Sequence, residues 1–354
     1  MLRLKYFLIS APFLLLLILF RGHFFRIGPT LKSKVISPQI VGKWVVGKHS
    51  KFNDADTLEL QVAIDNSLSG DTILLRPGKY KLKNIPSKNL IIRGLSGEAK
   101  DIEIELVDEI SIIKSKTRFE NIYLLSKKTT DVAFIVDSSD IIFDNTKVKF
   151  PGAKKILHLK NNSSLKSLNN HFIGSSKNTA IYLGDKSTLD ADNNKFIKFK
   201  NAIETEHGNF NGMVELQNIE ASNCTSSAFY IYGGHFRGVN LNISKSASGA
   251  IFLGGVNAQL ENISISDNKF FAIDALDGAQ VKIDLFNFDN NIKAGIHSSG
   301  NKSNLRAVNG KISNSETAII AENGANVTGK QINFFPAEMK PAKYSTDSLV
   351  NLIY

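Results

Sequence analysis

The chain has 354 residues, of which 42% are hydrophobic, so it can bury a substantial core. Its net charge of +10 favours polyanionic neighbours such as acidic polysaccharide or lipid headgroups. No RNP-like, zinc-finger or helix-turn-helix motif is present, so we expect no nucleic-acid partner. The single cysteine, Cys224, excludes an intramolecular disulfide and a cysteine-based metal cluster.

The first 28 residues carry a membrane-targeting pattern. Arg3 and Lys5 precede an apolar run over residues 6–20, and Arg21 follows it. The run is short for a spanning helix and has the length of a signal-peptide core, but no small-x-small cleavage site follows. We therefore predict an uncleaved, single-pass signal anchor with a short cytoplasmic N-terminus and a periplasmic or extracellular bulk. A cleaved signal peptide is the alternative.

Residues 29–55 are predicted to be a linker or entry strand. Asp56 is the expected N-cap of a helix, because Asp-Thr-Leu-Glu over residues 56–59 fits a capping box. Apolar residues then fall at helical spacing, at Leu60, Ala63, Ile64 and Leu68. An amphipathic helix that leads into a short strand at residues 72–75 is typical of a cap on the end of a stack of strands.

A repeat dominates the rest of the chain. Its unit is a small residue followed by apolar-variable-apolar, as in Ala180-Ile-Tyr-Leu183, and copies start at residues 202, 228, 250, 272, 295 and 318. The period near 22 lacks helical periodicity and the fixed leucine pattern of leucine-rich repeats. It predicts a parallel β-helix of 10 to 11 turns over residues 56–335, with asparagines in left-handed turn positions. Residues 336–354 are predicted to be a C-terminal cap or tail.

A family resemblance follows from these motifs. The segment DTILLRPGKY at residues 71–80, LIIRG at residues 90–94 and the Ala-Ile-x-Leu units resemble the pectin-lyase-like superfamily. The resemblance implies an all-β, single-stranded, right-handed parallel β-helix. The superfamily contains polysaccharide lyases, hydrolases, epimerases, esterases and non-catalytic binders. The catalytic motifs of polygalacturonases, pectate lyases and alginate epimerases are absent, so no active site is carried over.

The variable residue of each Ala-Ile-x-Leu unit is expected to point outwards, because side chains alternate along a strand. This outward column combines aromatic, histidine and acidic residues. Rings can stack on sugar faces, and carboxylates can bind hydroxyls or move protons. The predicted substrate-binding residues are His158, Tyr182, His207, Tyr230, Tyr232 and Phe252. A merely solvated surface is the alternative for each of them.

Two pairs are the candidate catalytic residues. Glu204 and Glu206 lie two residues apart on one strand, where they could serve a glycosidase or coordinate Ca²⁺; otherwise no metal or cofactor is expected. Asp274 and His297 lie one turn apart, so the aspartate could orient the histidine for acid–base work. Glu204 and Asp274 are three turns apart, about 14 Å, which is too far for a direct acid–base pair.

The sequence thus predicts a membrane-anchored extracytoplasmic protein that binds a cell-envelope or extracellular polysaccharide. If it is an enzyme, the expected reactions are elimination, epimerisation or glycoside hydrolysis. The charge favours an anionic polymer, whereas the acidic column residues argue against one. The alternative is a non-catalytic scaffold or adaptor in envelope polysaccharide assembly or export, with envelope proteins as partners.

Overall fold

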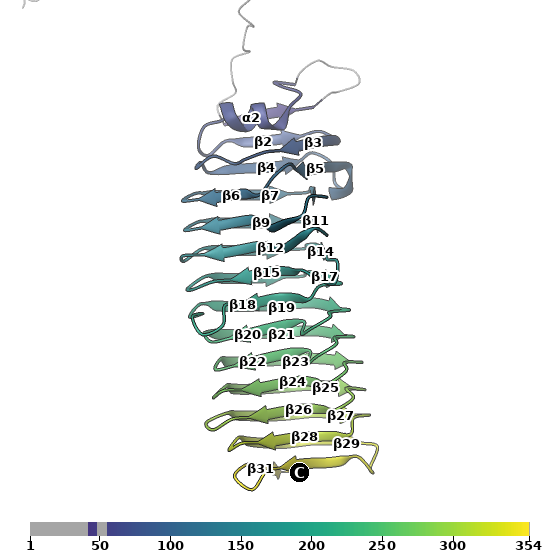
Figure 1. The fold of residues 1–354 in the computed structure, drawn as a ribbon. Helices are drawn as coiled ribbons and strands as arrows, with labels where there is room; N and C mark the ends of the chain where they lie inside the picture. Colours follow the sequence, from purple (N-terminus) through teal and green to yellow (C-terminus); the bar gives the residue numbers. More distant parts are fainter. Residues whose placement is uncertain (1–41, 48–54, 354) are drawn as a thin grey trace, which may run out of the picture. The chain divides into compact units, whose positions relative to one another are not determined.

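The computed structural model describes residues 42–47 and 55–353. The predicted anchor over residues 1–28 lies outside these residues. Within them, no helix has the length and apolar character needed to span a bilayer. Residues 39–354 form one compact unit, and its described part is a stack of turns that runs from α2 to β31 (Figure 1).

Every described strand pairs in parallel within one of two sheets. The 11-stranded sheet, here called the repeat sheet, carries the Ala-Ile-x-Leu units. Its strands are β6 (Ile110–Ile113), β9 (Thr130–Asp137), β12 (Ala153–Lys160), β15 (Thr179–Leu183), β18 (Asn201–Thr205), β20 (Phe229–Tyr232), β22 (Ile251–Gly254), β24 (Phe271–Leu276), β26 (Ala294–Ser299), β28 (Thr317–Glu322) and β30 (Lys340–Tyr344). This sheet accounts for 11 turns, and β1 to β5 precede its first strand, so the stack has about 12 turns, slightly more than the predicted 10 to 11.

The 20-stranded sheet, here called the second sheet, covers the other side of the stack. Its first strands are β1 (Lys43–Val46), β2 (Thr72–Leu75), β3 (Gly78–Leu82), β4 (Leu90–Gly94), β5 (Ile102–Leu106), β7 (Lys116–Glu120), β8 (Tyr123–Leu125), β10 (Asp140–Asp144), β11 (Lys147–Lys149), β13 (Ser164–Leu168), β14 (His171–Ile173), β16 (Thr188–Asp192) and β17 (Lys195–Ile197). The later turns contribute longer strands: β19 (Met213–Ser222), β21 (His235–Ser244), β23 (Asn257–Ser266), β25 (Gln280–Asp289), β27 (Asn304–Ser313) and β29 (Asn326–Phe335), with β31 (Leu349–Ile353) last.

The apolar residues of the repeat form a continuous core between the sheets. Ile181 and Leu183 of β15 are fully buried, as the alternation predicted. Phenylalanines fill the interior of the earlier turns, and the rings of Phe172 and Phe196 stack with their centroids 4.9 Å apart. Stacking the same residue type on successive turns removes large apolar areas from water without leaving cavities.

Asparagines occupy the corners of the second sheet, as expected. Asn218, Asn240 and Asn262 all have positive φ, a conformation that asparagine adopts at low cost. Their amides form a ladder: Nδ2 of Asn240 donates to Oδ1 of Asn218 at 2.8 Å, and Nδ2 of Asn262 donates to Oδ1 of Asn240 at 2.7 Å. The ladder satisfies the side chains and fixes the register of neighbouring turns.

Two predictions at the ends of the stack are corrected. Helix α2 spans Leu60–Asn66, its N-cap is Glu59, and no side chain caps it. The Asp56 carboxylate instead accepts a hydrogen bond from the backbone N–H of Val45 at 2.7 Å, which ties it to β1. Leu68 lies beyond the helix and is 67% exposed, because the chain leaves the helix before Leu68 can join its apolar face.

The structure adds strands on both sides of the predicted residues 56–335. Strand β1 lies within the segment predicted as a linker or entry strand, and it is an entry strand that pairs in parallel with β2. Beyond residue 335, β30 and β31 extend the repeat sheet and the second sheet respectively. The segment 336–354 therefore contains another turn. This turn was not recognised in the sequence because apolar residues such as Tyr344 and Leu349 are exposed, so they do not follow the usual alternation of buried apolar and exposed polar residues.

Candidate carbohydrate site on the repeat sheet

The predicted outward column exists in the predicted register. Successive strands of the repeat sheet pair its members directly with one another. The column reads Ile135, His158, Tyr182, Glu204, Tyr230, Phe252, Asp274, His297 and Ile320. Neighbouring members are therefore separated by one strand spacing, about 4.8 Å. The structure brings these candidates together on one face; their roles stay predictions.

Asp274 and His297 form a hydrogen-bonded pair. Nδ1 of His297 lies 2.7 Å from Oδ1 of Asp274, and its Nε2 lies 3.7 Å from Oε2 of Glu322. The side chains of Asp274 and His297 are 16% and 13% exposed. The ring of Phe271 stacks on the imidazole with centroids 4.4 Å apart. Packing and the aspartate thus hold the ring still, with Nε2 directed towards a second carboxylate.

A flat aromatic platform lies next to this pair. The rings of Tyr230 and Phe252 stack with centroids 4.3 Å apart and only 3° between their planes. Phe252 is paired with Asp274 on the following strand. Burial raises the pKa of Tyr230, and the nearby carboxylates, Glu204 foremost, raise it further, so its hydroxyl stays protonated at neutral pH. Because the two rings cover each other's faces, they direct apolar edges outwards beside polar groups, a mixed composition that suits a sugar subsite.

Glu204 is held by its neighbours. Its Oε2 accepts hydrogen bonds from Oγ1 of Thr179 at 2.7 Å and from Nδ2 of Asn201 at 2.8 Å. Glu206, two residues later, is half-buried beside Gly184. The fixed orientation of Glu204 suits the binding of a sugar hydroxyl at its other oxygen. Glu204 is therefore held in one orientation by these two hydrogen bonds.

Calcium binding at these glutamates stays a prediction. Ca²⁺ takes six to eight oxygen ligands, so the two carboxylates would supply only part of its shell, and Oε2 of Glu204 already accepts two hydrogen bonds. Among residues 42–47 and 55–353, no group of three or more His, Cys, Asp or Glu side chains is arranged to hold a metal ion.

His158 and Tyr182 form a second aromatic cluster. Their rings meet edge to face with centroids 4.9 Å apart, and Nζ of Lys155 lies 3.3 Å from the centre of the Tyr182 ring. Burial, with help from Lys155 and Lys160, lowers the pKa of His158 to about 4. His158 is therefore neutral near pH 7 and can contact a sugar through hydrogen bonding or ring packing.

Tyr232 and His207 lie at the edge of the same face. Their ring centroids are 4.0 Å apart, and the Tyr232 hydroxyl donates a hydrogen bond to Oδ2 of Asp277 at 3.3 Å. Gly254 makes room for this ring, because a Cβ at that position would come within 2.4 Å of it. His207 itself is exposed.

Sequence reasoning missed several neighbours of these residues. The column contains only the variable position of each unit, whereas the missed contacts come from the strand starts and from the turns. These residues are Lys155, Thr179, Asn201, Phe271 and Asp277. Glu322 lies two residues after the outward position of β28, so the alternation along the strand predicts it on the same face, where the structure has it.

Comparison with known proteins agrees on the fold. No family model matches the sequence. The catalytic unit of a thermostable GH87 α-1,3-glucanase from Streptomyces thermodiastaticus strain HF3-3 aligns over 89% of this chain and 70% of its own, with 11% identity and a TM-score of 0.63. A polygalacturonase from Erwinia carotovora ssp. carotovora aligns over 90% of this chain and 99% of its own, with 10% identity and a TM-score of 0.50.

The chain has the pectin-lyase-like right-handed parallel β-helix fold. A GH87 α-1,3-glucanase catalytic domain in complex with nigerose is also similar, with 13% identity, a TM-score of 0.58 and coverage of 91% of this chain and 70% of its own. At these identities the likeness concerns the fold, and the chemistry has to be argued from the residues of this chain.

Proposed function

We propose that the outward face of the repeat sheet binds a polysaccharide and hydrolyses it. The observation that carries the proposal is the run of four adjacent positions Tyr230, Phe252, Asp274 and His297, which puts a stacked pair of aromatic rings directly beside a hydrogen-bonded Asp–His pair. The run spans about 14 Å, enough for two or three sugar units along the stack. The structural neighbours named as glucanase and polygalacturonase support carbohydrate as the ligand class.

His297 is the proposed acid–base group. Its Nδ1–H donates to Asp274, so in the neutral ring Nε2 carries the lone pair. Nε2 can take a proton from the attacking water as the water oxygen bonds to the anomeric carbon, and it can release that proton to the leaving glycosidic oxygen as the glycosidic C–O bond breaks. Asp274 and Glu322 stabilise the imidazolium between these steps, and Glu322 is assigned no separate proton transfer because its Oε2 lies only 3.7 Å from Nε2.

The test uses full-length protein, purified in detergent because of the apolar segment at residues 6–20. α-1,3-Glucan oligosaccharides and oligogalacturonates are incubated with it and followed by proton NMR. New reducing-end signals support hydrolysis, whereas vinyl or altered anomeric signals indicate elimination or epimerisation instead. We expect His297→Gln and Asp274→Asn to slow turnover by about 100-fold or more while circular dichroism is unchanged. Asp185→Asn, in an exposed turn, is the control.

A non-catalytic carbohydrate scaffold is the second candidate. It is favoured by Glu204, whose Oε2 is already saturated by two internal hydrogen bonds. Co-elution of an unchanged polymer, lost in Tyr230→Ala, would support this function. If neither α-1,3-glucan nor galacturonate oligosaccharides were turned over or co-eluted with the protein, the proposal of a carbohydrate ligand would be contradicted for both of them.

Membrane anchoring through residues 1–28, with an extracytoplasmic β-helix, belongs to the same proposal and rests on the sequence pattern alone. Deletion of residues 1–28 should move the protein from the membrane fraction to the soluble fraction. Unchanged fractionation would contradict the anchor.

A further inference from the structure

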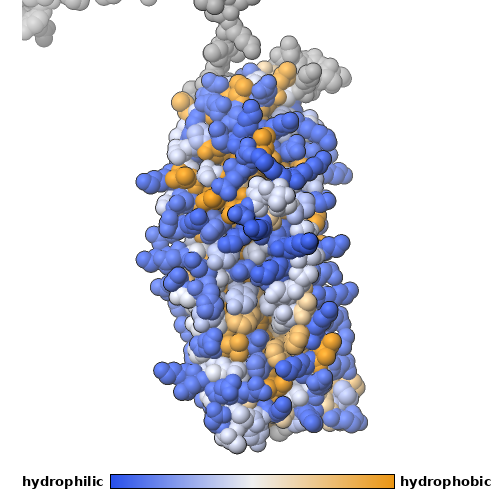
Figure 2. Space-filling view, viewed as in Figure 1, coloured by the Kyte–Doolittle hydropathy of each residue, from blue (hydrophilic) through white to orange (hydrophobic). Residues whose placement is uncertain are grey.

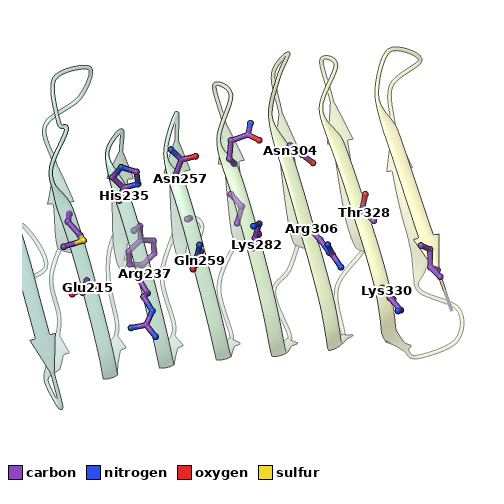
Figure 3. Close-up of a pocket in the computed structure, with 16 residues that line it drawn as sticks. Glu215, His235, Arg237, Asn257, Gln259, Lys282, Asn304, Arg306, Thr328 and Lys330 are labelled. Atoms are coloured by element: carbon purple, nitrogen blue, oxygen red, sulfur yellow. The ribbon is translucent and has the colours of Figure 1, made fainter.

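A groove lined by both apolar and charged side chains lies on the second sheet, away from the candidate site. It has a volume of about 990 Å³ and crosses β19 to β31 (Figure 3). Four cationic side chains line it: Arg237, Lys282, Arg306 and Lys330. The face of the molecule in Figure 2 is largely hydrophilic, with small separate apolar patches. No part of the proposed function uses this groove.

The strand register aligns the cations along the stack. Arg237, Gln259, Lys282, Arg306 and Thr328 are paired in that order on successive strands. Lys282 and Arg306 are therefore direct neighbours, about 4.8 Å apart at their backbones. Like charges placed opposite each other in a sheet are destabilising, so this arrangement calls for a compensating anion.

These cations have no carboxylate partner in the structure. Within the described residues, none of the four lies within 4.0 Å of an Asp or Glu oxygen, whereas Lys166 and Lys195, also on the second sheet, pair with Asp190 and Glu220 at 3.4 and 2.7 Å. Glu215 is the one carboxylate that lines the groove, so four positive charges and one negative charge give a net charge of +3.

A second, shallower groove continues this surface and does contain acids. It shares Arg237, Lys282 and Arg306 and adds Glu261 and Asp284. Oδ1 of Asp284 accepts a hydrogen bond from Nδ2 of Asn309 at 2.8 Å, so this carboxylate is directed to the ladder at the corner. The two grooves together carry four cationic and three acidic side chains. Glu215 pairs in register with Arg237, whereas Lys282 and Arg306 pair with each other and have no acidic register partner, so the uncompensated positive charge lies at these two residues.

The geometry points to an extended anionic glycan, with carboxylates on its sugars, as the occupant of this groove. Guanidinium and ammonium groups bind such carboxylates. Gln259 stands between Arg237 and Lys282, and Asn257 and Asn304 lie in the neighbouring column, where their amides can pair with sugar hydroxyls. The one aromatic lining residue besides an imidazole, Phe236, is only 2% exposed, so the stacking platform that single-stranded nucleic acids use is not offered.

The test measures affinity of the full-length protein for polygalacturonate by calorimetry at low and moderate salt. We expect the triple variant Arg237→Gln/Lys282→Gln/Arg306→Gln to bind at least about tenfold more weakly, and binding by the wild type to weaken as salt rises. The matched control Lys177→Gln/Lys186→Gln/Lys269→Gln removes the same charge from exposed positions outside the groove and should stay within about twofold of the wild type. Circular dichroism checks the fold of both.

An unchanged affinity of the groove variant for polygalacturonate would overturn the proposal, and so would an equal loss of affinity in the control variant. Equally tight binding of single-stranded DNA, or of dextran sulfate lacking carboxylates, would replace the glycan-carboxylate assignment with general attraction of polyanions. Neutral α-1,3-glucan carries no carboxylates, so its co-elution tests only the carbohydrate site on the repeat sheet. Failure of that site can therefore be distinguished from failure of the groove on the second sheet.

Discussion

His158 shows how the environment of a single residue makes the stability of the fold depend on pH. Burial, followed by the charges of Lys155 and Lys160, lowers its pKa from 6.5 to about 4 in the folded protein. Between these two values the unfolded chain binds more protons than the folded one. The free energy of unfolding should therefore fall as the pH is lowered through this window.

We expect the contribution of His158 between pH 7.5 and 5 to be about 1 kcal/mol, once solvent screening is allowed for. Urea denaturation of the wild type and of His158→Gln at both pH values measures it. The variant should lose less stability on acidification. His207→Gln, which changes an exposed histidine, is the control and should follow the wild type. Parallel losses in all three proteins would contradict the role of His158.

At a corner of the second sheet, Leu285 interrupts the asparagine ladder. Leu285 has φ 54° and lies between Asn262 and Asn309 in the register, with its side chain 50% exposed. A leucine in this conformation carries a steric cost of about 1–2 kcal/mol that asparagine largely avoids. Leu285→Asn should therefore raise the free energy of unfolding by about 1 kcal/mol.

Leu285→Ala is the comparison for this change. It removes the exposed leucine but keeps a Cβ at positive φ and supplies no amide, so it should give no stabilisation. Both variants are measured by urea denaturation. If Leu285→Asn is no more stable than Leu285→Ala, the ladder does not contribute to the stability of the corners.

The same elements show what the sequence could predict and what it could not. The repeat of about 22 residues located the strands, and the alternation of side chains along each strand then predicted which residues point outwards, for example Tyr182 and Asp274. The N-cap was misplaced, because the Asp56 carboxylate accepts the backbone N–H of Val45 on β1 and the Thr57 hydroxyl accepts the N–H of Glu59. Contacts such as Thr179 with Glu204 depend on how neighbouring turns align, which a single repeat unit does not encode.

At the scale of the whole molecule, the stack should tolerate loss of one complete turn. Asn240 and Asn262 occupy equivalent corner positions, so deletion of residues 240–261 joins Val239 to Asn262 in register. Since each turn contacts mainly its neighbours, the shortened chain should still fold, with lower stability. Circular dichroism and a thermal melt would show a retained β spectrum and one transition.

A deletion of half a turn provides the contrast. Removal of residues 240–250 would bring a corner of the second sheet against a strand of the repeat sheet, so core and surface residues would exchange places. We expect this variant to be insoluble. If both deletions behave alike, the turns are not independent units of the fold.

The layered construction also determines how the folded protein should meet a protease. A turn inside the stack hydrogen-bonds to a turn on each side, whereas β30 and β31 have partners on one side only within the described residues. Cleavage should therefore begin at an end, and each cut exposes the next turn as a new end. The fragments would shorten by one repeat at a time, which is 22 to 26 residues between the units that start at residues 180 and 318. The interior turns that hold Tyr230 and Phe252 would persist after the terminal turns are lost.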